Sequence, residues 1–346
     1  MKIFYGVQGT GNGHITRARV MARELAYAGM DVTFMFTGKN TAHYFDMEVF
    51  QRYLVKSGLT FSMRNGQVRY LKTAVDAKPI QFLKDVVALD LGDYDLIISD
   101  FEPVTAWAAK RYKKTVLGIG HQYAFNHDIP KTGSDPIANM VMKNFAPVDV
   151  GIGLHWHHFN QPILPPIIEI TESSSNINKR KIIVYLPFEE HETVMKFLTP
   201  FVDFEFHVYI SAQVMSRLSH IQFKPLSRDG FRRDFHDCAG IISNAGFELA
   251  SESLLAGKKI LAKPLHSQME QLSNAFALQQ LGYGQTMYEL DTKVVAAWLY
   301  DQHAVQINYP NVAQIIVQWI GQGMPKMTNE FIASVWRKAE VTKILH

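Results

Sequence analysis

The sequence contains one cysteine, Cys238, no long apolar run and little excess charge. A lone cysteine cannot form an internal disulfide, which excludes a disulfide-stapled secreted domain and indicates a reducing compartment. No run approaches the ~18 apolar residues of a membrane-spanning helix, and the run after Met1 is too short for the core of a signal peptide. We therefore expect a cytoplasmic protein.

The charge balance is mild, with a formal net charge of +3 and a pI near 8.7. A dedicated nucleic-acid binder is far more basic, so no nucleic-acid partner is expected, whereas a phosphorylated ligand is compatible with this charge. One short basic run, Lys110–Lys114, follows Trp107 by one helical turn. It predicts either peripheral contact with the inner face of a membrane or simply a solvated helix end.

The chain of 346 residues is long enough for two domains, and 47% of its residues are hydrophobic. Apolar strands alternate with amphipathic helices from Ile3 onward, which predicts parallel sheets covered on both faces. A proline-rich joint at Gln161–Lys181 interrupts this pattern, which restarts at Ile182. The expected fold class is α/β, with two Rossmann-like domains whose parallel sheets face each other across a cleft. The expected division is a first domain over 1–165, a linker over 166–180, a second domain over 181–325, and a C-terminal helix over 326–346 that packs back toward the first domain.

The first strand runs into the glycine-rich segment Gly9–His14, with the sequence GTGNGH. Glycines let backbone amides approach a bound group, and the helix that follows favours negative charge at its start. The spacing G-x-G-x-G is not that of a dinucleotide site, and Phe36–Gly38 supplies no carboxylate for a ribose. Lys39 and Asn40 also fail the P-loop pattern. NAD and ATP sites are therefore disfavoured.

His14 stands at the first turn of the expected helix, where an imidazole can take a proton from a substrate hydroxyl. Asp100 follows the strand Leu96–Ser99 at the same rim and can fix the tautomer of that imidazole. The plainer alternatives are a histidine that only packs locally and an aspartate that caps the helix near Pro103. Glu102 is a weaker candidate for either role.

Four further residues are expected on this acceptor-side rim. Gly11 and Gly13 belong to the glycine loop, and His121 and Gln122 follow the strand Val116–Ile119. The carboxyl ends of neighbouring parallel strands meet at one edge of a sheet, where such folds bind their ligands. We therefore expect these residues to contact the acceptor.

The second half contains a strand, a glycine turn and a helix around Asn244–Phe247. The turn formed by Asn244, Ala245, Gly246 and Phe247 offers free amides and a helix dipole to a diphosphate. Glu252, farther along the helix, can accept hydrogen bonds from both ribose hydroxyls, and Glu270 and Gln271 can hold sugar hydroxyls. The alternative is an ordinary strand–helix–strand unit with a capping asparagine and solvated glutamates.

These motifs resemble those of GT-B glycosyltransferases, in particular the UDP-glycosyltransferases and the lipid II-forming N-acetylglucosaminyltransferase of peptidoglycan synthesis. In the second half the residues that match the donor signature are Gly246, Phe247, Glu252, Glu270, Gln271, Asn274 and Ala275. In the first half, GTGNGH is similar to the family's acceptor-side loop with its catalytic histidine, and Asp100 is similar to the partner of that histidine.

The chain departs from the family pattern at two places. Asn244 stands where relatives have a phosphate-binding histidine, so a possible charge is lost. Glu189 and Glu190 stand in a loop where relatives have small phosphate-contacting residues. Since two carboxylates would repel a diphosphate, we expect these side chains to point away from it.

The resemblance implies an inverting, metal-independent hexosyl or N-acetylhexosaminyl transfer from a nucleotide diphosphate sugar, with UDP as the expected nucleotide. No metal site and no cofactor are expected, since the nucleotide sugar is a co-substrate and no D-x-D motif ends a strand. The acceptor, lipid-linked or a polysaccharide, is expected to contact the segments Gln67–Asp76 and Tyr123–Asp135, with domain closure about the joint. Two alternatives remain: a nucleotide-sugar 2-epimerase of the same architecture, and a non-catalytic sugar-nucleotide-binding protein.

Overall fold

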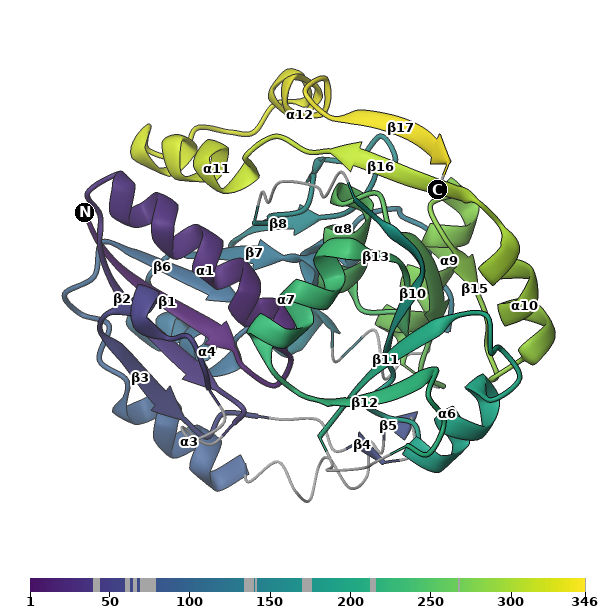
Figure 1. Ribbon diagram of the computed structural model, residues 1–346. Coiled ribbons are helices and arrows are strands. Elements are labelled where there is room, and N and C mark those ends of the chain that lie inside the picture. Colours follow the sequence, from purple (N-terminus) through teal and green to yellow (C-terminus); the bar gives the residue numbers. More distant parts are fainter. Residues whose placement is uncertain are drawn as a thin grey trace.

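A computed structural model describes residues 1–39, 44–59, 63–64, 67–68, 79–133, 140, 142–169, 176–211, 216–266 and 268–345. Two parallel sheets stand side by side, and helices cover their faces (Figure 1). Residues 170–175 of the expected linker lie outside the described residues, as do 69–76 and 134–135 of the expected acceptor segments.

The first sheet has seven strands in the order β3-β2-β1-β6-β7-β8-β9, all parallel. Its strands are β1 (Lys2–Gln8), β2 (Asp31–Thr37), β3 (Tyr53–Lys56), β6 (Leu96–Asp100), β7 (Val116–Gly120), β8 (Val150–Leu154) and β9 (Ile163–Leu164). Uninterrupted apolar strands such as β6 are buried on both faces, as parallel sheets require. The covering helices are α1 (Asn12–Tyr27), α3 (Pro79–Ala88) and α4 (Pro103–Tyr112), with short 3-10 turns η2 (Glu48–Phe50) and η3 (His121–Asn126) and an antiparallel pair β4 (Met63–Arg64) and β5 (Gln67–Val68).

The second sheet has six parallel strands in the order β12-β11-β10-β13-β14-β15. Its strands are β10 (Asn178–Tyr185), β11 (Glu205–Ile210), β12 (Ile221–Pro225), β13 (Cys238–Asn244), β14 (Lys259–Lys263) and β15 (Gln285–Thr286). Its helices are α6 (His191–Leu198), α7 (Arg228–Asp237), α8 (Phe247–Leu255), α9 (Met269–Leu281) and α10 (Thr292–Tyr300).

The strand order reverses direction at β1 in the first sheet and at β10 in the second. In open parallel sheets the crevice beside such a reversal, at the carboxyl ends of the strands, is where ligands bind. In the first sheet Val7 pairs with Asp100, so the ends of β1 and β6 lie together. The fold thus brings the glycine loop after β1 beside the residue that ends β6.

The C-terminal segment returns to the first sheet. It consists of β16 (His303–Asn308), α11 (Val312–Gly321), α12 (Asn329–Trp336) and β17 (Glu340–Leu345). Helix α11 lies against α1, and the Trp336 indole donates to the Ile163 carbonyl at 2.7 Å (Figure 1).

The sequence predicts a helix over 326–346, but helix forms only over Asn329–Trp336. The residues after it form β17, which pairs antiparallel with β16. The reason lies in the alternating, β-branched sequence Glu340–Leu345, which suits a strand. No helix in the described part of the chain is long and apolar enough to cross a membrane.

Candidate functional site

The glycine loop is shaped by close contacts from two directions. A Cβ at Gly9 would lie 2.3 Å from the Tyr44 hydroxyl and 2.7 Å from the Thr37 carbonyl oxygen, so no larger residue fits. A Cβ at Gly13 would lie 2.6 Å from the Cγ of Glu248, which belongs to the second sheet's helix α8. Gly11 is the N-cap of α1 and offers no capping side chain. The loop therefore leaves the start of α1 open toward the cleft.

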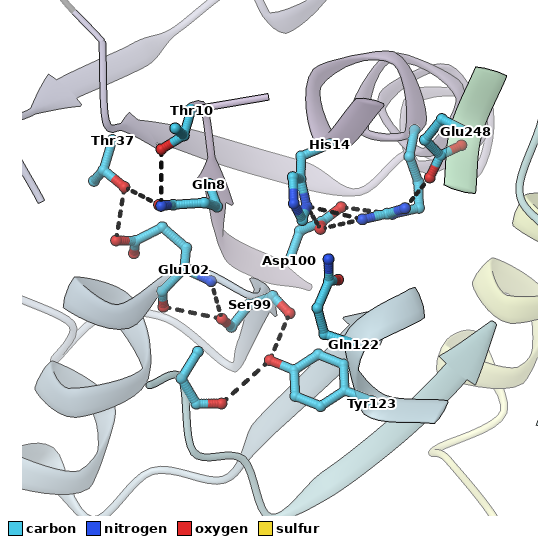
Figure 2. A network of polar contacts seen from close by, with 12 residues as sticks. Gln8, Thr10, His14, Thr37, Ser99, Asp100, Glu102, Gln122, Tyr123 and Glu248 are labelled. Carbon is cyan, nitrogen blue, oxygen red and sulfur yellow. Dashed lines mark hydrogen bonds and ion pairs between the residues drawn. The ribbon is translucent and has the colours of Figure 1, made fainter. Parts of the chain in front are cut away.

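His14 and Asp100 form a hydrogen-bonded pair at this start, with Nδ1 of His14 2.6 Å from Oδ1 of Asp100 (Figure 2). Asp100 is fully buried, whereas the His14 side chain keeps 15% of its surface exposed. An ionised carboxylate can only accept, so the bond to Asp100 places the proton on Nδ1 and leaves the lone pair on Nε2, although Nη2 of Arg17 also lies 2.9 Å from Nδ1. A pair arranged in this way can work as a general base with its orienting carboxylate.

Arg17 completes this cluster, and the sequence analysis missed it. Its Nε and Nη2 donate to the two oxygens of Asp100 at 2.8 Å and 2.5 Å. Burial opposes the ionisation of Asp100, but Arg17 and His14 outweigh it and hold the pKa of that carboxyl below its ordinary value. The signal that was available is the spacing, because Arg17 follows His14 by three positions and therefore shares its helix face.

The alternative in which Asp100 caps the next helix is wrong, because Glu102 takes that place. The Glu102 carboxylate accepts from the amides of Val104 at 2.8 Å and Thr105 at 2.7 Å. It also accepts from the Thr37 hydroxyl at 3.0 Å. Burial raises the pKa of Glu102. With both oxygens occupied, Glu102 supports α4, and Asp100 stays free for His14.

Across the cleft, β13 ends at Asn244 and α8 begins after Gly246, which is its N-cap and supplies no side chain. Nothing lies within 4 Å of a Cβ placed on Gly246, so the start of α8 faces open space. Asn244 donates through Nδ2 to the Lys263 carbonyl at 3.0 Å, and its buried Oδ1 has no partner among the described residues. Asn244 therefore presents a hydrogen-bond acceptor, which suits a hydroxyl rather than a phosphate oxygen.

Ala245, in the same turn, is buried, and its carbonyl accepts from the Asn274 amide group at 3.0 Å. This bond fixes the turn that leads into α8. Oε1 of Glu189 forms an ion pair with Nζ of the buried Lys263 at 2.6 Å. The repulsion expected between Glu189 and a diphosphate is relieved by that cation.

Glu252 lies in α8, and Arg228 and Arg232 of α7 act on its charge. Burial raises the pKa of Glu252 to about 7, Glu169 adds to the rise, and Arg232 and Arg228 oppose it. Arg228 and Arg232 also reach the first half of the chain, since both pair with Glu169 and Arg228 pairs with Asp46 at 2.8 Å. Glu252 thus sits within a ring of charges that joins the two halves.

Gln122 and Glu270 meet across the cleft, with Nε2 of Gln122 3.2 Å from both carboxylate oxygens of Glu270. The Oε1 of Gln122 is buried and has no partner among the described residues. In Figure 2 the Gln122 side chain points toward Asp100. Gln271 accepts from the Leu265 amide at 3.0 Å. Gln122 therefore lies between the His14–Asp100 pair and the residues expected to hold a sugar.

His121, expected at the acceptor, is instead part of the contact between the two halves. Its Nδ1 lies 2.8 Å from the Leu154 carbonyl oxygen and its Nε2 lies 2.7 Å from Oδ1 of Asn274. Its ring stacks on that of Phe247, and burial lowers the pKa of His121. Because both ring nitrogens face protein groups, His121 has none left for a substrate hydroxyl.

A cavity of about 870 Å³ lies between the two sheets. It is lined from the first half by His14, Arg17 and Gln122 and from the second by Asn244, Glu252 and Glu270. Phe101, Met142 and Phe145 add apolar surface. Among the described residues no group of three or more His, Cys, Asp or Glu side chains has the arrangement of a metal site.

Comparison with known proteins gives a consistent picture. The family model "Glycosyl transferase family 1" matches residues 1–302. A search of curated proteins gives no significant match. Similar solved structures include the kitacinnamycin glycotransferase, at 13% identity with a TM-score of 0.62, covering 94% of this chain and 99% of that chain. UGT89C1 of Arabidopsis thaliana complexed with UDP has 10% identity and a TM-score of 0.63, and the match covers 96% of this chain and 99% of that chain. The Streptomyces sp. SF2575 glycosyltransferase SsfS6, complexed with thymidine diphosphate, has 11% identity and a TM-score of 0.58, covering 93% and 99%.

Proposed function

We propose that this chain transfers a sugar, with inversion at the anomeric carbon, from a UDP-sugar to an acceptor hydroxyl. The chain belongs to glycosyl transferase family 1 and has the GT-B fold. The observation that carries the proposal is the position of the His14–Asp100 pair. It lies on one wall of the cavity, and the open start of α8 and Glu252 lie on the other. A base and a candidate diphosphate site thus border one space.

In this mechanism Nε2 of His14 removes the proton from the acceptor hydroxyl as its oxygen attacks the anomeric carbon. The bond from that carbon to the diphosphate breaks in the same step, so the configuration inverts. Asp100 stabilises the imidazolium, to which its buried carboxylate is already bonded. A positioned base of this kind contributes about 10²–10⁴-fold in rate.

The leaving diphosphate carries its charge to the start of α8, where the first-turn amides of Phe247, Glu248 and Leu249 have no acceptor within the helix. The positive end of the helix dipole favours an anion there. We propose that this interaction serves in place of a divalent metal, and that no cofactor takes part.

Two of the similar structures are complexes with pyrimidine diphosphates, one with UDP and one with thymidine diphosphate. A thymidine nucleotide lacks the ribose 2′-hydroxyl. Glu252 has a carboxylate that can accept from two hydroxyls at once. This favours UDP as the donor nucleotide of this chain. The more specific resemblance of this chain to the lipid II-forming N-acetylglucosaminyltransferase stays a prediction.

The acceptor is proposed to enter on the side of His14, where Phe101, Met142 and Phe145 line the cavity. A lipid-linked or polysaccharide acceptor and a peripheral membrane contact stay predictions. Trp107 is 39% exposed, and Lys110 Nζ lies 5.1 Å from its ring centroid, so the basic helix end does present an aromatic side chain to its surroundings.

Calorimetric titration with UDP, thymidine diphosphate, ADP and GDP tests the donor site. We expect UDP to bind most tightly; binding by none of the four would contradict the proposal. Incubation with UDP-GlcNAc alone separates transfer from the alternatives. A 2-epimerase converts the sugar without an acceptor, whereas a transferase leaves it intact apart from slow hydrolysis. A non-catalytic binding protein would retain its cellular effect after His14→Ala.

A further inference from the structure

The base cluster is tied to the opposite wall of the cleft by one buried ion pair. Nη1 of Arg17 donates to Oε1 of Glu248, although the two residues are 231 positions apart in the chain. The side chain of Arg17 is 2% exposed and that of Glu248 11%. Gly13 makes the approach possible, since any side chain there would overlap Glu248. Figure 2 draws this contact as a dashed line that ends at Glu248, close to the labelled His14 and Asp100.

Arg17 therefore faces two carboxylates, one from each half of the molecule. Asp100, on the first sheet, receives two of its hydrogen bonds and in turn orients His14. Glu248, in the first turn of α8, receives the third. The chain of contacts runs from the proposed diphosphate end of α8 through Glu248 to Arg17. From Arg17 it reaches His14 both through Asp100 and directly, since Nη2 of Arg17 lies 2.9 Å from Nδ1 of His14.

We propose that Arg17 and Glu248 are positioning residues that make the His14–Asp100 base depend on the docking of the donor half of the molecule. This inference rests on the proposed function. When α8 is docked, Glu248 shares the guanidinium with Asp100. When α8 is not docked, the guanidinium of Arg17 pairs with Asp100 alone and draws that carboxylate away from the imidazole of His14.

The charges explain why sharing matters. With Glu248 ionised, two carboxylates surround one guanidinium, so the proton that His14 accepts neutralises the cluster. Without the second carboxylate the same proton creates a net positive charge in a buried site, which is costly. The titratable groups that face this cluster from the neighbouring elements are Tyr5, His121, Tyr123 and Glu252.

The test compares Glu248→Gln with a control, Glu24→Gln. The control makes the same substitution on α1, where Glu24 accepts from Asn311 of the C-terminal segment at 2.8 Å, ten residues along the helix from His14. At pH 9, where the Glu248 carboxylate is ionised, we expect Glu248→Gln to lower kcat by about 10- to 100-fold, part of what a positioned base supplies. The KM for the acceptor and the affinity for UDP should change little, and Glu24→Gln should change none of the three.

The pH profile provides a readout that a merely structural role would not move. Burial raises the pKa of Glu248 to about 8, Asp100 and Glu252 add to the rise, and Arg17 opposes it. A raised pKa means that the carboxylate forms as the pH rises through about 8. We therefore expect kcat of the natural protein to rise through that pH and the rise to be missing in Glu248→Gln.

A spectroscopic readout separates this inference from the proposed function. The Nδ1 proton of His14, held 2.6 Å from Asp100, should give a far-downfield proton NMR resonance. Glu248→Gln should shift or broaden it, and Glu24→Gln should not. An unmoved resonance together with an unchanged kcat would overturn the inference even in an active enzyme.

Other results have equally definite meanings. Equal losses of kcat in both variants would overturn the inference in favour of general domain docking. A natural protein that binds no nucleotide would contradict the proposed function, while the resonance would still report the coupling. If Glu248→Gln fails to fold, Glu248→Ala, which also removes the carboxylate, takes its place in every assay, with the same loss of kcat expected.

Discussion

The ring of Phe247, at the start of α8, stacks on the imidazole of His121 with centroids 3.9 Å apart and planes 3° from parallel. The two residues belong to different halves of the molecule, and Trp156 of the first half stacks against Phe247 as well. The Trp156 indole also donates to the Ser251 hydroxyl of α8 at 2.8 Å. The floor of the cleft is therefore a packed aromatic core, and wide opening about the joint at 161–181 would have to break it.

This stack predicts a large loss of stability for Phe247→Ala. Removing a buried phenylalanine costs about 3–5 kcal/mol of unfolding free energy, and the start of α8 should loosen at the same time. Chemical denaturation should show the loss, and calorimetry should show weaker UDP binding. The matched control is Phe276→Ala in α9, where the ring is 41% exposed and little change is expected. Equal effects of the two substitutions would contradict the role given to Phe247.

The His14–Asp100 pair predicts a separation of binding from catalysis. His14→Ala should reduce transfer by about 10²–10⁴-fold while leaving UDP affinity unchanged, because the proposed base is expected to contact the acceptor and not the nucleotide. Asp100→Asn should also lose most of the rate, since an amide can donate to Nδ1 and favour the other tautomer. Steady-state rates and calorimetry on the same preparations decide the matter. Weaker UDP binding in either variant would place the pair in the donor site instead.

Glu252 predicts a pH dependence of nucleotide binding. Its pKa is raised to about 7 by burial, so it is ionised above that pH and neutral below it. A carboxylate accepts from ribose hydroxyls more strongly than a neutral acid does. UDP affinity should therefore increase from pH 6 to pH 8, measured by calorimetry, and Glu252→Gln should flatten the change. Thymidine diphosphate, which lacks one hydroxyl, serves as the control with a weaker dependence. The same pH slope in Glu252→Gln would rule this carboxylate out.

Gln122 predicts the chemistry of the transferred sugar. Its free Oε1, the Oδ1 of Asn244 and the carboxylate of Glu270 are all hydrogen-bond acceptors around the cavity. Acceptors bind sugar hydroxyls and repel a sugar carboxylate, so UDP-glucose should be preferred over UDP-glucuronate.

Gln122→Ala should raise the KM for the donor sugar about 10-fold, the value of one or two lost hydrogen bonds, without changing the affinity for UDP alone. Glu270→Gln should reduce the preference for UDP-glucose over UDP-glucuronate, because it removes a negative charge that repels the glucuronate carboxylate. Competition assays with both donors measure this. Equal use of UDP-glucuronate by the natural protein would exclude an acceptor-lined sugar pocket, and a changed acceptor KM in Gln122→Ala would return Gln122 to the acceptor side.

Several features of the site could be predicted from the sequence because they follow from local rules. Asp100 and the loop before His14 both end parallel strands, and such ends share one rim of a sheet. The open turn at Gly246 and the helix after it are likewise local. The contacts of Arg17 could not be predicted in this way, since Asp100 and Glu248 lie 83 and 231 positions away from it in the chain. Only the packing of α1 against α8 brings them together.

The sequence by itself determined the two α/β halves, the strand ends that carry His14 and Asp100, and the glycines that leave two helix starts open. Periodicity and strand-end geometry act over a few residues, so they can be read without a fold. Tertiary structure alone decided that His121 stacks in the core instead of meeting a substrate and that Glu248 reaches Arg17 across the cleft. Both outcomes depend on how two separate sheets dock, and docking is set by surfaces built from residues far apart in the chain. Glu102 differs from them, because it caps α4 through the nearby amides of Val104 and Thr105.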